Sequence, residues 1–418
     1  MRVLLTTHPS LGHWHPLVPL AQALHAGGHE IAFVSTPRFC HTIEAHGFRC
    51  FAAGVEESAD ELRQRQAQLA TLSPDEQDAY MHTHVFAGVR AARSLPDLLA
   101  LIQAWRPAVV VSENTEFSGC VAAAQASLPH AAVQITAPRP HLLEVVEAPL
   151  RQLCASVGLP PCPPADLLHR YLVLSPRPAS LWPPAVPVPP TTHAFRYAGF
   201  NQAGPEGLPG WVVDLDRQRP TVYATLGTAF NHMTAVFAAI LDGLRDEPVN
   251  LILAIGRNRD PGEFGAVPSN VHIERYIPQS LLVPRCALVI SHGGSGTMLD
   301  ALSCGLPLVL LPIAADQPQN AQVCAHVGVA RVIVPVGHPG LAPAIREAAR
   351  TVLQDARYRQ AAQRVQQEIA ALPGLDYPVA LLERLAAERT PIRAPINAGQ
   401  EERTDKAAGV PGNPPDVR

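Results

Sequence analysis

Lysine is almost absent from this sequence: Lys406 is the only one among 418 residues, and it lies in a polar C-terminal segment. A P-loop needs a lysine on the nucleotide phosphates. Pyridoxal enzymes need a lysine that forms a Schiff base with the cofactor, and protein kinases need a lysine on a β-strand. The scarcity of lysine therefore argues against all three classes of enzyme.

Excess positive charge and long apolar runs are also missing. The formal net charge is −4, whereas nucleic acid is bound by basic surfaces, so we expect no nucleic-acid partner. No run of 18 uncharged apolar residues occurs, so the sequence predicts no stable insertion into a membrane. Residues 1–17 lack a small-residue cleavage site, and we interpret them as holding a first strand and not a signal peptide.

The eight cysteines form no C-x-x-C pair, and several of them lie in apolar runs. This pattern predicts scattered buried thiols in a reducing compartment and no zinc site. We therefore expect a cytoplasmic protein.

Short apolar runs bounded by turn residues predict buried parallel strands. Hydrophobic residues make up 47 % of the 418 residues, which favours two domains with sizeable cores. In the first half, strands are expected at residues 2–7, 31–36, 108–113 and 131–136. A helical pattern from Leu17 to Leu24 separates the first two runs, and this β-α-β order predicts a right-handed crossover.

The second half repeats this alternation after a proline-rich stretch at residues 158–220, near whose end, at 200–218, we place the interdomain linker. Strands are expected at residues 221–227, 250–256, 271–277, 287–294, 307–313 and 330–336, and helices at 232–246, 295–304 and 317–327. The periodicity ends after Arg389, which is typical of a disordered tail. We predict an α/β protein with two doubly wound, Rossmann-like parallel-sheet domains at residues 1–205 and 206–375, a C-terminal helix at 376–390 that packs back on the first domain, and a disordered tail at 391–418.

The segment HGGSGT at residues 292–297 lies between an apolar run and a helical pattern. Ligands of doubly wound sheets bind outside the carboxyl ends of the strands. At such a place a helix N-terminus offers free N–H groups, and glycines let an anion approach the backbone. The segment therefore favours a phosphate or diphosphate ligand; the alternative is an ordinary strand-to-helix turn with a capping serine.

Polar side chains beside this loop suit the rest of a nucleotide sugar. Tyr276, near the end of the preceding strand, could stack on a base, and Asp300, one helical turn beyond the loop, could accept from ribose hydroxyls. Asp316 and Gln317 follow the next apolar run and could hold a polyhydroxylated group. One ligand with a base, a ribose, a diphosphate and a sugar would contact all of these positions.

The segment from Tyr276 to Asn320 resembles the donor signature of the inverting GT-B glycosyltransferases, which include plant secondary-metabolite and bacterial natural-product transferases. The TLGT at residues 225–228 resembles the first loop of the same domain. The resemblance implies two domains facing across a cleft, with the acceptor bound by residues 1–205 and the donor by 206–375. The donor-binding residues that it implies are Gly227, Thr228, Tyr276, Pro278, Gln279, His292, Gly293, Gly294, Ser295, Gly296, Thr297, Asp300, Asp316 and Gln317.

The signature departs from the plant pattern, which has Trp, Asn and Glu where this chain has Tyr276, Gly296 and Asp300. The His-Gly-Gly-x-Gly-Thr form resembles actinobacterial antibiotic transferases, which commonly use thymidine diphosphate (TDP) deoxysugars. We therefore expect a TDP-sugar donor in preference to a uridine diphosphate (UDP) sugar, a small-molecule aglycone as acceptor, and no cofactor. No pair of carboxylates with ligand spacing flanks the phosphate loop, so we expect no metal.

The resemblance also implies a histidine general base, three residues before a proline in the loop after the first strand. His13 with Pro16 matches that spacing, and an imidazole pKa near operating pH suits the task. The alternatives are His8 and His15. The base would take the proton of an acceptor hydroxyl during an in-line displacement that inverts the anomeric carbon.

A carboxylate usually orients such a base, and the family has an aspartate at the end of a later strand. Glu113 occupies that position with one more methylene, and Glu116 is the competitor. The segment QDAYMHTHVF at residues 77–86 suits a large, partly aromatic acceptor, with ordinary helix packing as the alternative. The candidate acceptor-binding residues are His8, Tyr80 and His84.

Other functions on the same fold remain open at this point. A nucleotide-sugar epimerase would need catalytic acids in the cleft in place of a histidine base and an acceptor pocket. A non-catalytic nucleotide-sugar-binding or activator protein would be favoured by the loss of donor residues, which are intact here. A Rossmann dehydrogenase is disfavoured because G-x-G-x-x-G is absent. We expect a monomer or a homodimer.

Overall fold

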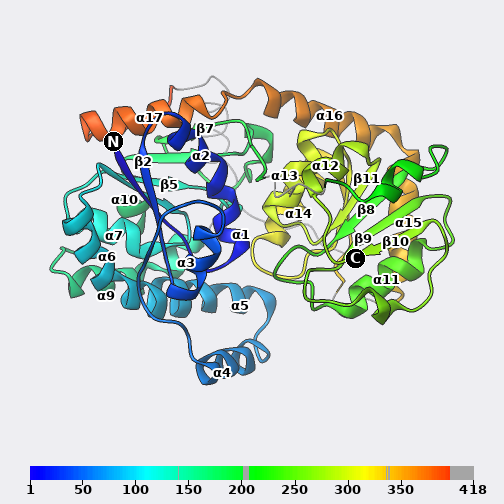
Figure 1. Cartoon of the computed structure of the whole chain (residues 1–418), viewed down its shortest axis with the longest axis horizontal. Coiled ribbons are helices and arrows are strands. Elements are labelled where there is room, and N and C mark those ends of the chain that lie inside the picture. Colours follow the sequence, from blue (N-terminus) through cyan, green and yellow to red (C-terminus); the bar gives the residue numbers. More distant parts are fainter. Residues whose placement is uncertain (140, 201–206, 336, 338, 396–418) are drawn as a thin grey trace, which may run out of the picture.

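Two parallel β-sheets, each flanked by helices, form the frame of the protein and lie side by side (Figure 1). The computed structural model describes residues 1–139, 141–200, 207–335, 337 and 339–395. The expected domain boundary at residue 205 and most of the expected tail, residues 396–418, lie outside the described residues.

The first sheet has seven parallel strands in the order β3-β2-β1-β4-β5-β6-β7. Their bounds are Arg2–Thr6 (β1), Glu30–Ser35 (β2), Cys50–Ala52 (β3), Val109–Glu113 (β4), His130–Val133 (β5), Leu172–Ser175 (β6) and Thr192–Ala194 (β7). Successive side chains of β1 point to opposite faces: Val3 and Leu5 share a core with α2, and Leu4 shares one with α6 and α7. The sequence patterns missed β3, β6 and β7, because these strands are short and the last two lie in the proline-rich stretch.

Helices cover both faces of this sheet. Their bounds are Leu11–Trp14 (α1), Val18–Ala26 (α2), Pro37–Glu44 (α3), Ala59–Leu69 (α4), Pro74–Tyr80 (α5), Met81–Arg90 (η2, a π-helix), Ala91–Trp105 (α6), Phe117–Gln125 (α7), Leu142–Val145 (α8), Glu147–Ser156 (α9) and Pro164–Leu168 (α10). The helices expected between residues 56 and 106 are therefore α4, α5, η2 and α6.

The second sheet has six parallel strands in the order β10-β9-β8-β11-β12-β13. The strands are Thr221–Thr225 (β8), Asn250–Ala254 (β9), Val271–Glu274 (β10), Leu288–Ser291 (β11), Leu308–Leu310 (β12) and Ala330–Val332 (β13). The helices are Thr234–Leu244 (α11), Gln279–Leu282 (α12), Ser295–Ser303 (α13), Gln317–Val327 (α14), Leu341–Gln354 (α15), Ala356–Ala371 (α16) and Asp376–Glu388 (α17). All six expected strands are present.

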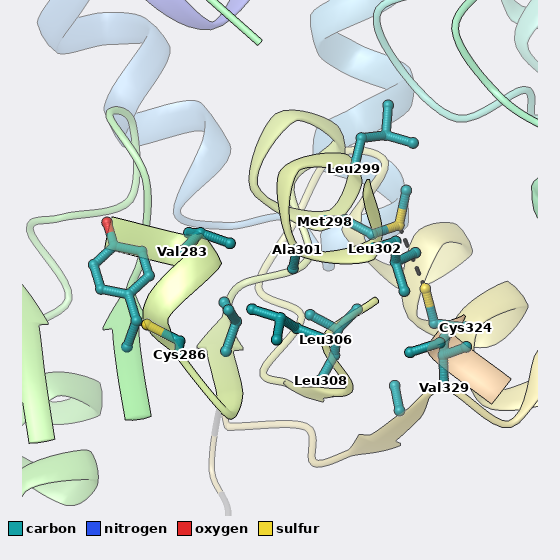
Figure 2. Packing of buried hydrophobic residues seen from close by; sticks show 14 of the residues in the cluster. Val283, Cys286, Met298, Leu299, Ala301, Leu302, Leu306, Leu308, Cys324 and Val329 are labelled. Carbon is teal, nitrogen blue, oxygen red and sulfur yellow. Dashed lines mark hydrogen bonds between the residues drawn. The ribbon is translucent and has the colours of Figure 1, made fainter. Parts of the chain in front are cut away.

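The helix α13, which follows the glycine-rich loop, is anchored by its apolar face. Met298, Leu299 and Leu302 are at most 2 % exposed and belong to the same hydrophobic cluster as Leu308, the first residue of β12 (Figure 2). The Cys324 thiol of α14 lies 3.4 Å from Met298 Sδ. This packing holds the start of α13 at the carboxyl end of β11.

The strand order reverses next to the first strand of each sheet, between β1 and β4 and between β8 and β11. Neighbouring connections leave such a switch point in opposite directions and open a crevice there. The loops after β1, β4, β8 and β11 therefore border the two crevices, and every candidate catalytic or diphosphate-binding residue lies on one of these loops or at the end of one of these strands.

The C-terminal helix α17 returns to the first domain, along which it lies in Figure 1. Leu381, Leu382 and Leu385 join the core that contains Val3 and Leu5 of β1. The packed chain continues into the segment that the sequence assigned to a tail: the Ile392 side chain is 1 % exposed, and its backbone N–H donates to the Tyr171 carbonyl at 2.8 Å.

Two cysteines correct the expectation of scattered free thiols, because Cys40 and Cys50 form a disulfide. The chain leaves β2 through α3 and returns as β3, which pairs with β2. This return brings the two Cα atoms to 5.3 Å, a contact that a ten-residue separation does not reveal.

Among the described residues, every helix is too short or too polar to span a bilayer.

Candidate active site

The His13 imidazole pairs with the Glu113 carboxylate at the switch point of the first sheet. His13 lies on α1, just after β1, and Glu113 is the last residue of the neighbouring strand β4. His13 Nδ1 lies 2.7 Å from Glu113 Oε1. The His13 side chain is 21 % exposed, whereas that of Glu113 is fully buried. Because an ionised carboxylate only accepts, Nδ1 carries the proton and Nε2 is the free acceptor, which is the tautomer that a general base needs.

Glu113 is held as a carboxylate in spite of its burial. Burial alone would raise its pKa, but the neighbouring His13 and His8 rings and the Thr115 N–H lower it to about 2. Thr115 donates its N–H to Oε2 at 2.6 Å and its hydroxyl to the same carboxylate. The methylene by which glutamate exceeds aspartate therefore does not prevent the contact with His13.

The competing acid Glu116 serves a different purpose. It is the N-cap of α7 and accepts from the Ser118 N–H at 2.9 Å and the Gly119 N–H at 3.0 Å. The Thr6 and Ser118 hydroxyls also donate to it, and burial raises its pKa. Within the described residues it makes no hydrogen bond to His13, so the two acids divide between helix capping and the histidine.

The alternative histidines are engaged elsewhere. His8 is 4 % exposed, its Nε2–H donates to the Thr115 carbonyl at 2.9 Å, and its ring stacks on Phe86 at 4.4 Å. Burial lowers its pKa to about 3. The ring of His15 packs against Trp14, and burial lowers its pKa to about 4. His13 combines partial exposure with a 2.7 Å contact to Glu113 Oε1, whereas the buried His8 lies 3.9 Å from the same oxygen through Nε2.

Tyr80 and His84, the other two candidate acceptor-binding residues, lie against each other. The rings of Tyr80 and His84 stack at 4.5 Å across the junction of α5 and η2. His84 is exposed and Tyr80 is half-buried, so both rings keep surface on this arm of the first domain. Their role in binding an acceptor stays a prediction.

The His292 ring marks the switch point of the second sheet. A Cβ added to Gly227 would lie 2.7 Å from His292 Cε1, and one added to Gly294 would lie 2.6 Å from Nε2. Gly227 also has a φ of +69°, which other residues rarely adopt. Burial lowers the pKa of His292 to about 4, so the ring is neutral at pH 7. Its Nδ1 is buried and has no partner among the described residues.

The start of α13 lies beside this ring. Its N-cap is Gly294, which has no side chain to satisfy the first N–H groups, so the groups of the first turn can bind an anion. The Thr297 hydroxyl lies 3.4 Å from Gln279 Oε1. The exposed Gly296 leaves the helix start open on this side. The loop thus combines open amides with an unpartnered imidazole.

The expected base and ribose positions are covered by protein groups. The Arg257 guanidinium lies 3.7 Å over the Tyr276 ring. Asp300 accepts from the Gln279 side chain and from the Tyr197 hydroxyl. Burial raises the pKa of Asp300 to about 6. Pro278 precedes α12 and sets the direction in which Gln279 enters this cluster.

Asp316 and Gln317 lie together after β12, but they contact different groups. Gln317 Oε1 accepts from the backbone N–H groups of Ile313 at 2.8 Å and Ala314 at 3.1 Å, and so braces the loop. Asp316 Oδ2 accepts from the Ser295 hydroxyl at 2.7 Å. The expected donor residues are therefore gathered at one edge of the second sheet, and of this pair Asp316 is hydrogen-bonded to Ser295 at the start of α13.

The two edges face each other. A Cβ added to Gly12, next to His13, would lie 3.9 Å from the Thr228 hydroxyl of the loop after β8. The Ala137 N–H, from the loop after β5, donates to Asp316 at 2.8 Å. His13 and the α13 loop therefore both lie near the interface between the two domains.

The comparisons with known proteins identify the family of the chain. The family described as erythromycin biosynthesis protein CIII-like matches with its N-terminal domain at residues 22–227 and with its C-terminal domain at residues 238–385. The L-demethylnoviosyl transferase of Streptomyces niveus is 32 % identical over 399 residues, which cover 93 % of this chain and 98 % of the relative. The chain belongs to the erythromycin biosynthesis protein CIII-like family of glycosyltransferases.

Solved structures confirm the predicted GT-B fold of this glycosyltransferase. The glycosyltransferase SnogD from Streptomyces nogalater superposes with a TM-score of 0.73 at 27 % identity, covering 92 % of this chain and 99 % of the other. Spinosyn rhamnosyltransferase SpnG complexed with thymidine diphosphate gives a TM-score of 0.74 at 25 % identity, with coverage of 92 % and 100 %.

Several residues of the transferase site were missed from the sequence. Thr115, Arg177, Tyr197, Arg257 and Asn320 contact the candidate residues but carry no catalytic motif. Asn320 lies in the donor segment, four residues after Asp316 on the same face of α14, and that spacing was a usable signal. The others come from loops that only the fold brings to the cleft.

Potential metal ligands are not clustered in the described part of the transferase: no group of three or more histidine, cysteine, aspartate or glutamate side chains there could hold a metal ion. The α13 amides and the His292 ring lie at the position where a diphosphate is expected.

Proposed function

We propose that this glycosyltransferase moves a deoxysugar from a TDP donor to a hydroxyl group of a natural-product aglycone in antibiotic biosynthesis, with inversion and without a metal ion. The observation that carries the proposal is the 2.7 Å contact between His13 Nδ1 and a buried, ionised Glu113. This pair lies across the interdomain space from a helix start suited to a diphosphate.

The first domain supplies the base. His13 Nε2 removes the proton of the acceptor hydroxyl as that oxygen attacks the anomeric carbon, and the imidazolium that forms is stabilised by Glu113. General-base catalysis of this kind contributes about 10²–10⁴-fold. Glu113 does not take up the proton, because its pKa of about 2 lies far below that of imidazole.

The second domain supplies the leaving-group site. As the anomeric bond to oxygen breaks, negative charge develops on the TDP oxygens, where the α13 N–H groups and the helix dipole stabilise it. His292, which is neutral, contributes a hydrogen bond and not a charge. In-line inversion requires that the oxygen attacks from the side of His13 and that the diphosphate departs towards α13, on opposite faces of the sugar.

The donor proposal has independent support from the family. The relative from Streptomyces niveus is named for transferring a demethylnoviosyl group, and SpnG is a rhamnosyltransferase that was solved with TDP. Both groups are deoxyhexoses. Because these relatives are named transferases, the family also favours transfer over the epimerase and binding-protein alternatives.

The test combines binding and turnover. TDP, UDP and other nucleoside diphosphates are compared by thermal shift, and we expect TDP to stabilise the protein most. TDP-deoxysugars are then incubated with candidate aglycones, and the anomeric configuration of the product is read by NMR. Retention of configuration, or product formed without an acceptor, would refute the proposal.

The role of His13 is tested separately. His13→Ala should lower kcat by about 10²–10⁴-fold and leave TDP affinity unchanged. The matched control is His25→Ala, because His25 is an exposed histidine on α2. A His13→Ala enzyme that keeps full turnover would show that another group is the base.

A further inference from the structure

Arg177 is a buried cation that crosses the domain interface. It follows β6 of the first domain, and its side chain is 2 % exposed. Its Nη2 donates to the Ser295 hydroxyl at 2.5 Å and to Asn320 Oδ1 at 2.9 Å, both in the second domain. A buried guanidinium is costly unless its partners are well placed, so this contact demands a close fit between the domains.

The partners of Arg177 form one cluster around Asp316. Its Oδ2 accepts from the Ser295 hydroxyl at 2.7 Å, from Asn320 Nδ2 at 3.0 Å and from the Ala137 N–H at 2.8 Å. Arg177 Nη2 lies 4.0 Å from the same oxygen. All of these contacts end on Oδ2.

The second carboxylate oxygen of Asp316 is not used in this way. Among the described residues Oδ1 accepts no hydrogen bond, and it is not one of the buried polar atoms that lack a partner. An oxygen with neither a protein partner nor full burial can accept from a ligand hydroxyl. One oxygen of Asp316 is thus fixed by protein, and the other is left for a ligand.

We propose that Arg177 is a positioning residue for the donor sugar: from the acceptor-binding domain it fixes Ser295, Asn320 and, through them, Asp316, so that Asp316 Oδ1 is presented to a sugar hydroxyl. The inference rests on the proposed function, because it takes a nucleotide sugar as the ligand. Two of the groups that hold Asp316, those of Arg177 and Ala137, belong to the first domain. The sugar subsite is therefore complete only when the cleft is closed, whereas the diphosphate site lies within the second domain alone.

The chemistry favours arginine at this position. Both acceptors are bound by Nη2, whose two N–H groups are fixed in the guanidinium plane, whereas lysine ends in a rotating ammonium on a flexible stem. Arg177→Met removes the donors at similar volume, and Arg177→Lys keeps the charge without the planar N–H pair. Loss of these charged hydrogen bonds should release the Ser295 and Asn320 side chains and misalign Asp316, whereas the backbone N–H groups of α13 stay in place within the second domain.

The experiment measures Kd for TDP and for the TDP-sugar on each variant by calorimetry, together with KM and kcat. We expect Arg177→Met to weaken TDP-sugar binding about 10- to 100-fold, to leave TDP binding unchanged, and to reduce discrimination between donors that differ at one sugar hydroxyl. The affinity of Arg177→Lys for the TDP-sugar should lie between that of the wild type and that of Arg177→Met. The control is Arg196→Met, because Arg196 also joins distant segments, through the Leu372 carbonyl, but lies outside the cluster.

The outcomes separate the two proposals. Equal losses for TDP and TDP-sugar, or no loss for either, would overturn the role of Arg177. If Arg177→Met fails to fold, the Lys variant decides the question by the same ratio of affinities, since a merely structural role would change both ligands alike. A wild-type protein that binds neither TDP nor TDP-sugar would instead refute the proposed function.

Discussion

Replacing Glu113 by glutamine tests the histidine–carboxylate pair with almost no change of shape. In the native protein one carboxylate oxygen accepts from His13 Nδ1 at 2.7 Å and the other from the Thr115 N–H at 2.6 Å. Glutamine has a single acceptor oxygen, and the Thr115 N–H, which can only donate, retains it. The amide NH₂ then faces Nδ1, which must accept, so the His13 proton moves to Nε2. An imidazole in that tautomer cannot take a proton from the acceptor hydroxyl.

The expected loss follows from these contacts. A hydrogen bond to a charged group contributes about 1.5–3 kcal/mol, which corresponds to about 10- to 150-fold in rate. Inverting the tautomer removes the base itself, which is worth about 10²–10⁴-fold. We therefore expect the Glu113→Gln enzyme to lose about 10²–10⁴-fold in kcat, with unchanged affinity for TDP.

The assay is product formation from a TDP-deoxysugar and an aglycone, with the folded fraction checked by circular dichroism. The matched control is Glu116→Gln: Glu116 is 5 % exposed and caps α7 without contacting His13 in the described structure. Once corrected for folded protein, the control should turn over at the wild-type rate. A Glu113→Gln enzyme with wild-type kcat would refute the reasoning.

Three further predictions concern the leaving-group site, acid stability and metal ions. Gly294→Ala should weaken TDP binding about 5- to 150-fold, because its Cβ would lie 2.6 Å from His292 Nε2; Gly374→Ala, which lies outside the donor loop and whose Cβ meets nothing within 4 Å, is the control, and equal TDP affinities of the two variants in calorimetry would contradict the tight fit of Gly294 against His292. Stability should fall as the pH drops from 6.5 towards 4, because several buried histidines have folded pKa values of about 3 to 4 and take up protons on unfolding; a melting temperature that stays flat between about pH 6.5 and about pH 4.5, where unfolded histidines become protonated, would count against this. These histidines are His8, His15, His82, His130, His169 and His292. EDTA should leave transfer unchanged, and inhibition that Mg²⁺ reverses would contradict the metal-free scheme.

The sequence alone was informative where the determinants are local. The donor signature occupies one continuous segment from Tyr276 to Asn320, and its loops follow apolar runs that could only be buried strands. Strand ends of a parallel sheet meet at one edge, so the order of motifs was enough to predict that His292, Asp300 and Asp316 would gather there. The expected fold followed from the same alternation of strands and helices. The strands that were missed are short: β6 and β7 lie in the proline-rich stretch, and β3 is a three-residue strand that pairs with the preceding strand β2.

The tertiary structure decided which of two neighbouring acids pairs with His13. Glu113 and Glu116 are three positions apart, and both are buried acids. Only the end of β4 and the start of α7 determine that one meets His13 while the other caps a helix. Sequence spacing could not separate them, because the partner of Glu113 lies 100 positions away.

The contacts between domains depend on the fold even more strongly. Arg177 meets Ser295 across 118 positions, and Ala137 meets Asp316 across 179. A local pattern records which face of an element is buried, but not which distant element covers it. The sequence therefore predicted which residues form each half-site, and only the packing of the two domains against each other decided which of these groups meet, because their partners lie at least 118 positions away.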